Sequence, residues 1–594
     1  MATDKASLLA NEGGPRPSVL YSTASYIIAT EFCERLAYYG FAGSLVLFFQ
    51  TKLNMSNEDA VNQFYAWNGF VYVTPLIGGY IADAYLGRYT TILYFSLLYL
   101  VGLALFVFGS VPGAIVQGVI FTAMYTVAMG AGGIKPNVST MGADQFDPKI
   151  PQDKKESEQF FSYFYWSINL GALVAYSLVA YVCQYGLPFL GGEDWGFFVG
   201  YLIPTIMMCF GVAVFMSGSA RYKKVTPKGS ILSTVAGILY EALITRYNDR
   251  SPTGFLLDKA NINYGGSFTA NDVEGVKYVA KLTPFLAVMI PYWGIYGQTK
   301  TAFQIQGCQM ESKLGDFQLP ISAMNMFNNV AILILVPLTD QYLYPKLKAS
   351  GIKLTMLNKI GWGFFFAVLA MVVAALIELY RMQEAPSAGN YLNDPSAIDN
   401  ISPCRNIDNY NPYIYQQWYA GDDVDKPTNC HQTCSDLDAN GQLDISCIDC
   451  DNIPQMSHLS IFWQVPQFVL IGISEIFASI TSLEFFYSQA PSRMRSVSQA
   501  SNLFTNALGS WLTIPLTILV NVNPRHQWVT SNVDDGNLQA YFYLLAGLMT
   551  GALGVFYYLS NGYEYADPAQ LAALDHVDLS DVHVNLLPPE DEDM

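Results

Sequence analysis

Long apolar runs separated by polar connections form the main pattern of this chain. Each run holds about 20 residues, the length at which a helix crosses the hydrocarbon core of a bilayer. The chain is therefore expected to be an all-α, polytopic membrane protein. The pattern predicts twelve spans, near residues 21–49, 61–82, 89–111, 114–138, 161–184, 193–217, 278–299, 319–342, 358–380, 459–482, 496–521 and 537–560.

Composition supports the membrane assignment and argues against one class of partner. Hydrophobic residues make up 52% of the 594 residues and charged residues 13%, against roughly 25% charged in soluble domains. Much of the net charge of −18 lies in the connection after the ninth span and in an acidic tail that includes residues 590–593. No basic stripe occurs in the sequence, so a nucleic-acid-binding role is not supported.

The distribution of Lys and Arg predicts the topology. The first span follows a polar stretch with no small-residue cleavage site, so it is expected to be a retained helix. Basic residues gather in the connections after even-numbered spans, and such connections are cytoplasmic. Both termini are therefore expected in the cytoplasm. The bias is carried by Arg88, Lys149, Lys154, Lys155, Arg221, Lys223, Lys224, Lys228, Lys346, Lys348, Lys353, Arg493 and Arg495.

The spans and polar segments predict a domain organisation with two halves. The middle linker is basic at its start and contains an amphipathic stretch near 231–245, expected to be a helix along the cytoplasmic face. The expected segments are a cytoplasmic tail (1–20), a six-helix half (21–217), the linker (218–277), helices seven to nine (278–382), an extracellular or lumenal insert (383–457), helices ten to twelve (458–561) and an acidic cytoplasmic tail (562–594).

Three ionisable side chains lie inside the first span: Glu31, Glu34 and Arg35. Charged groups at membrane depth are costly and usually functional. Helical spacing places all three on one face, so Arg35 can pair with either carboxylate while the other holds or passes on a proton. The alternative is a static ion pair that holds helices together.

Two further charges fall in apolar helices, Lys135 in the fourth span and Glu475 in the tenth. Lys135 is a candidate partner for the first-span carboxylates or for an anionic substrate group, although a lysine near a helix end can also extend to the membrane surface. Glu475 stands alone in apolar surroundings in the sequence. It is expected to be protonated unless a cation arrives, so it is a candidate for ammonium binding and proton linkage.

A G-x₃-D-x₃-G-R pattern follows the second span, from Gly79 to Arg88. Glycine lets helices approach closely, and Asp83 and Arg88 can cap helix ends and pair across a cytoplasmic gate. The pattern resembles a signature of the major facilitator superfamily, and residues 340–343 repeat it weakly, as two parallel six-helix halves would. Glu484, near Arg493 and Arg495 in the sequence, is assigned to the gate.

Four motifs in order resemble the proton-dependent oligopeptide transporter family, which includes the plant peptide and nitrate transporters. They are Glu31-x-x-Glu34-Arg35, the Gly-Gly-Ile-Lys-Pro run at 132–136, Ala-Asp-Gln-Phe-Asp at 143–147, and Phe-Tyr-x-x-Ile-Asn-x-Gly at 164–171. The resemblance covers nearly the whole membrane portion. It implies a major facilitator fold that carries di- and tripeptides with protons by alternating access.

The resemblance also implies roles for individual residues. A peptide's carboxylate would meet Arg35 or Lys135 in one half, and its ammonium would meet Glu475 and Asn328 in the other. For Asn328 the alternative is a buried hydrogen bond between helices. The tyrosines that match pocket positions could instead be ordinary packing. These tyrosines are Tyr39, Tyr72 and Tyr165.

Proton coupling is expected to rest on Glu31, Glu34, Arg35 and Glu475, because all five histidines lie outside the predicted spans. The proton is the only coupling ion expected, with no other cofactor and no metal site. The expected partners are di- and tripeptides, protons and membrane lipids.

Two departures from the family pattern leave the substrate class open. Tyr65 stands where some animal members have a histidine, and Ala42 where many peptide transporters have an arginine. Span seven lacks the histidine that a nitrate carrier uses, which makes nitrate less favoured. The alternatives are another small solute, such as nitrate, a hormone or a glycoside, or a receptor on the same fold that does not transport.

The insert holds five cysteines, and on an oxidising side of the membrane these favour disulfides over zinc, with one thiol left over. Residues 436–447 match the first half of a calcium-binding loop, but Cys447 occupies the position of its final glutamate. Sequons occur at Asn54 and Asn400. The cysteines are Cys404, Cys430, Cys434, Cys447 and Cys450.

The N-terminal tail carries the run Asp-Lys-Ala-Ser-Leu-Leu at residues 4–9. This run resembles an acidic dileucine sorting signal. It favours an endosomal, lysosomal or vacuolar membrane, with the plasma membrane as the alternative.

Overall fold

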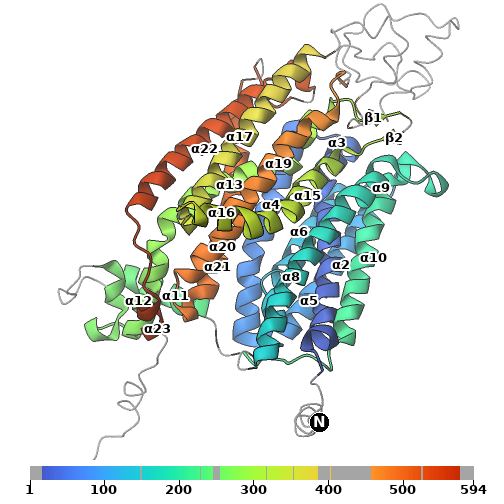
Figure 1. The fold of residues 1–594 in the computed structure, drawn as a ribbon. Helices are drawn as coiled ribbons and strands as arrows, with labels where there is room; N and C mark the ends of the chain where they lie inside the picture. Colours follow the sequence, from blue (N-terminus) through green and yellow to red (C-terminus); the bar gives the residue numbers. More distant parts are fainter. Residues whose placement is uncertain are drawn as a thin grey trace, which may run out of the picture.

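The structure is a computed structural model that describes residues 17–574, except 148–149, 228, 230, 245–254, 316, 352–353, 386–401, 403, 405–455, 524–525 and 531. Long helices that run side by side form the body of the molecule (Figure 1). All twelve ranges predicted as spans are helical, because apolar side chains cover them and each helix satisfies its own backbone polar groups.

The N-terminal half begins with α2 and ends with α10. Its helices start and stop at local signals: the Ser56 hydroxyl accepts from Asp59 N at the start of α4, and Gly87, with φ of +74°, separates α4 from α5. The helices are α2 (Ser25–Gly43), α3 (Leu45–Lys52), α4 (Asn57–Ile81), α5 (Arg88–Gly109), α6 (Gln117–Ile134), α7 (Val138–Ala143), α8 (Pro151–Val174), α9 (Ala180–Tyr185) and α10 (Gly196–Ser217).

The second half follows a linker with two helices, α11 (Ile231–Ile244) and α12 (Ala270–Lys281). A short hairpin, β1 (Lys313–Leu314) with β2 (Phe317–Gln318), pairs antiparallel. The helices of the second half are α13 (Thr283–Tyr296), α14 (Ala302–Cys308), α15 (Asn325–Leu338), α16 (Tyr344–Ala349), α17 (Met356–Gln383), α19 (Val465–Ser474), α20 (Thr481–Ser488), α21 (Arg495–Asn521) and α22 (Leu538–Asn561), before a last short helix, α23 (Pro568–Ala573).

Nine continuous helical segments of the described residues are long and apolar enough to cross a bilayer. The other three predicted spans are the first, second and seventh. The first is divided at Ser44 between α2 and α3, and the seventh is divided at Thr301 between α13 and α14. The second, α4, begins with the polar residues 57–59. The first and seventh of these spans bring the charged residues Glu31, Glu34, Arg35 and Lys300 into the interior.

The two halves meet along α4 with α21 and along α8 with α15. Hydrogen bonds join them at the end of the bundle that the Lys and Arg distribution predicts to face away from the cytoplasm, and we call these bonds the outer seal. Asn57 Nδ2 donates to Thr530 O (2.6 Å) and Asn521 Nδ2 to Glu58 Oε2 (2.8 Å). The remaining bonds of the outer seal link Gln304 Nε2 (3.0 Å) and Ser322 Oγ (2.8 Å) to Gly43 O, Tyr65 OH to Thr301 Oγ1 (2.9 Å), Asn68 Nδ2 to Ser510 Oγ (2.9 Å), and Ile321 N to Gln184 Oε1 (2.9 Å).

A cavity of about 390 Å³ separates the halves at the other end of the bundle, which is predicted to be cytoplasmic. Its main walls are parts of α4 and α21 together with residues 135–137, which follow α6, and the start of α7, and Lys135 forms part of its lining. With the predicted topology, the halves are joined on the outer side and separated by this cavity on the cytoplasmic side.

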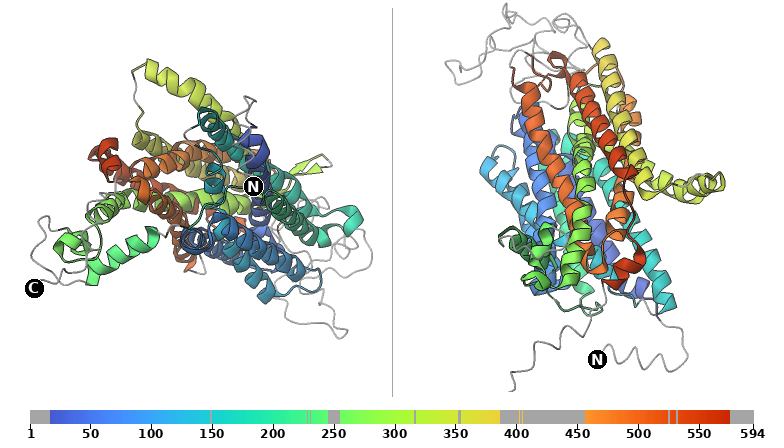
Figure 2. Two further views of the ribbon diagram at one scale, coloured as in Figure 1. Left: turned by 90° about the horizontal axis from the view of Figure 1, so that it is seen from below. Right: turned by 90° about the vertical axis from the view of Figure 1, so that its left-hand side faces the viewer.

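The linker is attached to the second half. Val235 and Ile238 of α11 and Val276 of α12 pack in one apolar cluster with Met494 and Val497 at the start of α21. Figure 1 places α11 and α12 at one end of the bundle, near α20 and α21, and the right-hand view in Figure 2 shows them at the same end. The helix α11 covers almost the same residues as the amphipathic helix predicted near 231–245.

An ion-pair network reinforces this attachment. Lys277 of α12 pairs with Asp258 (2.5 Å) and Glu274 (2.9 Å), and Asp272 reaches Arg493 (3.7 Å). Burial alone would lower the pKa of Lys277, but its hydrogen bonds to the two carboxylates raise it above the ordinary value. The linker is therefore positioned to move with the second half.

A disulfide joins Cys308 at the end of α14 to Cys404 in the insert. The sequence predicted disulfides among the five insert cysteines, with one thiol left over. For Cys404 this was wrong, because its partner, Cys308, lies outside the insert and is a sixth candidate. Ser402 Oγ donates to Cys308 O (2.6 Å), and Ser457 N donates to Gln309 O (2.9 Å). Residues 402 and 404 and the C-terminal end of the insert are thus held against the end of α14.

Cys308→Ser is expected to lower the stability of the folded protein. The disulfide closes a loop with a sequence separation of 96 residues, and loss of such a cross-link typically costs about 2–5 kcal/mol. Thermal unfolding of the purified protein, with and without reductant, measures the loss. Cys209→Ser, at an exposed free cysteine, is the matched control. Equal unfolding temperatures for the two variants would contradict the prediction.

Candidate functional site

The three first-span charges form one buried cluster on α2. Arg35 Nε lies 2.9 Å from Glu31 Oε1, and Arg35 Nη2 contacts Glu34 Oε2. The three residues are only 4%, 1% and 9% exposed in the order Glu31, Glu34, Arg35. One guanidinium therefore serves two carboxylates at the same time, whereas the sequence suggested that it pairs with one of them.

The helix α8 closes directly over this cluster. A Cβ at Gly171 would lie 2.9 Å from Phe32 O and 3.1 Å from Arg35 Cβ, so only glycine fits there without displacing α2. Asn169 Nδ2 donates to Tyr165 O (2.9 Å) one turn away. The motif at 164–171 thus supplies a close helix contact beside Arg35, together with the partly buried Tyr165.

Lys135 follows directly after α6 and lies between two tyrosine rings. Its Nζ is 3.9 Å from the centre of the Tyr38 ring and 4.4 Å from that of Tyr72. Ammonium groups over aromatic faces are stabilised by about 0.5–2 kcal/mol. Arg35 already contacts both carboxylates of α2. Lys135 is a further positive charge, and it lies at the cavity wall with its ammonium directed into the site.

Glu475 begins a π-helical turn after α19. It interacts with Tyr296, Asn328 and the ammonium of Lys300. The prediction that Glu475 stands alone in apolar surroundings was therefore wrong, because the seventh span brings a lysine to it. Asn328 is 6% exposed, and its Oδ1 lies close to the backbone of Gly472, where a Cβ would be 2.8 Å away.

Lys300 is the functional candidate that the sequence analysis missed. It is the last residue of a 3₁₀ turn, Gly297–Lys300, and Thr301 (φ −131°, ψ −96°) interrupts the helix directly after it. Lys300 is 8% exposed, and its Nζ lies 5.4 Å from the Tyr39 ring centre and 5.8 Å from that of Tyr38. The predicted span ended at residue 299, one position too early to include this charge.

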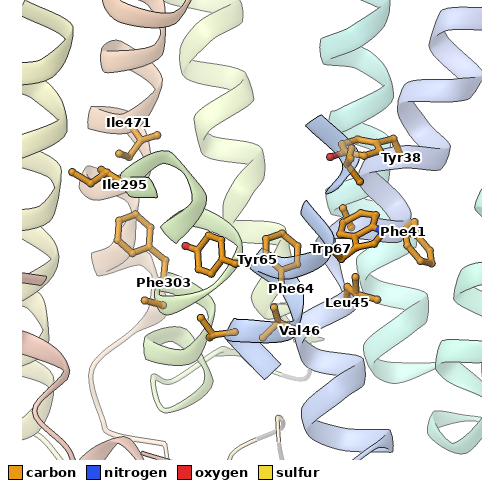
Figure 3. Close-up of a cluster of buried hydrophobic side chains, with 14 of the residues drawn as sticks. Tyr38, Phe41, Leu45, Val46, Phe64, Tyr65, Trp67, Ile295, Phe303 and Ile471 are labelled. Atoms are coloured by element: carbon orange, nitrogen blue, oxygen red, sulfur yellow. The ribbon is translucent and has the colours of Figure 1, made fainter. Parts of the chain in front are cut away.

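Tyr38 was also missed, although its spacing from Arg35 and Glu34 places it on the same helical face. Arg35, Lys135 and Lys300 all approach its ring. Figure 3 shows Tyr38 beside Trp67 and Phe41, with Tyr65 nearer to Ile295 and Phe303 of the second half. Tyr38 therefore lies where cations from both halves converge.

The predicted pocket tyrosines lie around the same space. Tyr39 packs edge-on against Tyr38 (5.4 Å between ring centres) and beside Tyr176 (5.8 Å). Tyr72 faces Lys135, and Tyr165 lies within electrostatic range of Glu475. The structure thus brings together the residues named for substrate binding in both halves, and their roles stay predictions.

The predicted gate residues are placed differently from one another. Asp83 and Arg88 line the cavity between the halves, but Arg88 pairs with Asp144 of its own half. Glu484 is exposed on α20. Both arginines predicted beside it have other partners: Arg493 lies 3.7 Å from Asp272, and Arg495 stacks on Tyr487 (4.4 Å). A gate role for Glu484 stays a prediction without a contact that supports it.

Several predictions concern residues outside the described ones. They are the sorting signal at 4–9, the sequon at Asn400, the calcium-loop match at 436–447, residues 575–594 of the acidic tail, and Cys430, Cys434, Cys447 and Cys450. The sequon at Asn54 lies in an exposed turn between α3 and α4, with φ of +51°; its glycosylation stays a prediction.

Comparison with known proteins gives consistent matches along the chain. The family model described as POT family (PTR2) matches residues 89–414 and 445–530. The curated protein NRT1/PTR FAMILY 8.3 of Arabidopsis thaliana is 31% identical over 92% of this chain and 92% of its own length. NRT1/PTR FAMILY 8.1 of the same plant is also 31% identical, over 92% of this chain and 94% of its own.

Solved structures show the same fold. The crystal structure of the POT family transporter PepTSo superposes with a TM-score of 0.68 at 23% identity, covering 92% of this chain and 99% of that one. An auto-inhibited POT family peptide transporter gives a TM-score of 0.67 at 22% identity, with 92% and 98% covered. The fold is that of the major facilitator type, with two six-helix halves.

Proposed function

The chain belongs to the POT family of membrane transporters, and from this premise we propose that it is a proton-coupled symporter of di- and tripeptides. One observation carries the proposal: Arg35 and Lys135 of the first half face the same space as Glu475 of the second half. A zwitterion presents one charged end to each half, so binding it would draw the halves together around a central site.

The second half supports an amine-bearing substrate. Glu475 Oε2 and Asn328 Oδ1 are buried acceptor atoms with no hydrogen-bond partner among the described residues. An ammonium has three donors and no acceptor, so it can satisfy both atoms together. Nitrate has no such donor, and it would leave both acceptors without a partner.

Proton coupling is supported by the number of carboxylates on α2. Arg35 contacts both Glu31 and Glu34, so one carboxylate can take up a proton while the other still balances the guanidinium. A substrate carboxylate that approaches Arg35 would compete with these glutamates. Protonation of one glutamate would therefore favour substrate binding, which is the linkage that a symporter requires.

A second candidate function is transport of a small organic or inorganic anion. Its support is the convergence of Arg35, Lys135 and Lys300 on Tyr38, because three cations around one ring favour an anionic group. Relatives are named for both NRT1 and PTR, so the names leave this choice open. A receptor on the same fold that does not transport would bind ligand without accumulating it.

Uptake of a labelled dipeptide into proteoliposomes across an imposed pH gradient tests the proposal. Uptake is expected to rise as the outside is acidified, and Glu475→Gln is expected to lower it about 10- to 100-fold, the loss of a charge-assisted hydrogen bond of about 1.5–3 kcal/mol. Glu564→Gln, at an exposed glutamate after α22, is the control. Uptake of nitrate or another anion, with no dipeptide uptake or competition, would overturn the peptide assignment.

A further inference from the structure

Lys300 occupies the part of the site where the amino group of a substrate is expected. It comes from the seventh span, it is more than nine-tenths buried, and it interacts electrostatically with Glu475. The other charged or aromatic groups around its ammonium are Arg35 and Lys135 of the first half and the rings of Tyr38 and Tyr39.

The broken helix positions this ammonium. Lys300 is in the last turn before the break at Thr301, and carbonyl groups at a helix C-terminus favour a cation. Tyr65 of α4, in the opposite half, contacts this break. Its hydroxyl forms a hydrogen bond with Thr301 Oγ1 (2.9 Å), and its ring packs so closely against Gly297 that a Cβ there would lie 2.7 Å from the ring. The backbone at Lys300 is therefore fixed, while its four-carbon side chain keeps several rotatable bonds.

The number of charges in the site limits what can bind. Three basic side chains, Arg35, Lys135 and Lys300, lie among three acidic ones, Glu31, Glu34 and Glu475. A substrate ammonium at Glu475 would bring two cations to one buried carboxylate, and like charges repel strongly in such a place. One of the two ammonium groups must therefore leave Glu475 when the other binds.

We propose that Lys300 is a built-in substitute for the substrate's amino group, which neutralises Glu475 in the empty transporter and moves away when an amine-bearing substrate binds. This inference rests on the proposed function. With Lys300 beside it, the charge of Glu475 is neutralised in the empty protein. The empty protein can therefore return to the outward-facing state without a proton on Glu475. The substrate's ammonium gives the loaded protein the same balance.

Two transport modes separate this role from simple substrate binding. Net uptake requires the empty protein to reorient, whereas exchange of labelled for unlabelled dipeptide across the membrane does not. Lys300→Met keeps most of the side-chain length and removes the charge. It is expected to lower net uptake about tenfold and to leave exchange within about twofold of wild type. Lys359→Met, at a lysine stacked on Tyr344 outside the site, is the control. Equal loss of both modes, or loss of neither, would overturn the proposal.

A measurement without substrate tests the charge pairing itself. Lys300→Met leaves Glu475 without its cation, so the ligand-free protein is expected to unfold at a lower temperature, and Lys300→Met/Glu475→Gln is expected to recover part of that loss. No recovery in the double variant would overturn the proposal even if wild type carries dipeptides. If the double variant recovers stability but wild type carries no dipeptide in either mode, the proposed function is refuted, and the pairing of Lys300 with Glu475 still stands.

Discussion

Arg35→Met is expected to abolish transport and to lower the free energy of unfolding by about 3–5 kcal/mol, the usual result of removing one partner from a buried ion pair. The reason is that Arg35 contacts both Glu31 and Glu34, which are 4% and 1% exposed. Without the guanidinium, two carboxylates at membrane depth lose their cation. Dipeptide uptake and thermal unfolding of the purified protein measure the two effects.

A second substitution keeps this prediction testable if Arg35→Met fails to fold. Arg35→Lys retains the charge but not the planar fork that reaches two carboxylates. It is expected to recover much of the stability and little of the transport. Arg221→Met, at an exposed arginine that bonds to Ser22 O, is the control. Wild-type stability in Arg35→Met would show that the carboxylates are neutral in the resting protein.

Gly78→Ala is expected to destabilise the first half, although alanine favours helices over glycine by about 1 kcal/mol. A Cβ at Gly78 would lie 2.3 Å from Gly132 O and 2.5 Å from Gly133 Cα. Both are backbone atoms, which cannot rotate out of the way as a side chain can. The helices α4 and α6 must then separate, at a cost of about 1–3 kcal/mol. Lys135 follows α6 directly, so its ammonium would move with the helix, and uptake is expected to fall as well.

The neighbouring residue is a matched control for this prediction. A Cβ at Gly79 would meet no atom within 4 Å, so Gly79→Ala brings the same gain in helix propensity without the clash. Unfolding temperatures and dipeptide uptake of the two variants are compared with wild type. If Gly78→Ala is as stable as Gly79→Ala, the close approach of α4 and α6 does not determine the fold.

The positions of the helices could be predicted from sequence because the signals are local. A run of about 20 apolar residues has one stable solution in a bilayer, and helical spacing alone brings Glu31, Glu34 and Arg35 to one face. The amphipathic helix near 231–245 was found in the same way. Its structure, Ile231–Ile244, differs from the prediction by one residue.

Contacts between distant parts of the chain could not be predicted in this way. The partner of Cys404 is Cys308, which lies 96 residues away in another segment. Arg88 meets Asp144 and not a residue of the opposite half. The proximity of Lys300 to Glu475 depends on a helix break at Thr301 that hydropathy does not indicate. In each case tertiary packing, and not the local pattern, determines the partner.

The composition of the outer seal has a consequence for a transporter that faces an acidic compartment. The bonds that join the halves there use amides, hydroxyls and main-chain carbonyls, and Glu58 is the one carboxylate among those described above. Amides and main-chain carbonyls do not titrate in the physiological range, and hydroxyl groups keep their protons there. A drop in external pH would therefore leave the closure nearly as strong as before, and acid would act on the carboxylates of the central site. In the proposed symporter, the barrier to leakage and the carboxylates proposed to respond to the proton gradient are thus chemically separate parts of the same protein.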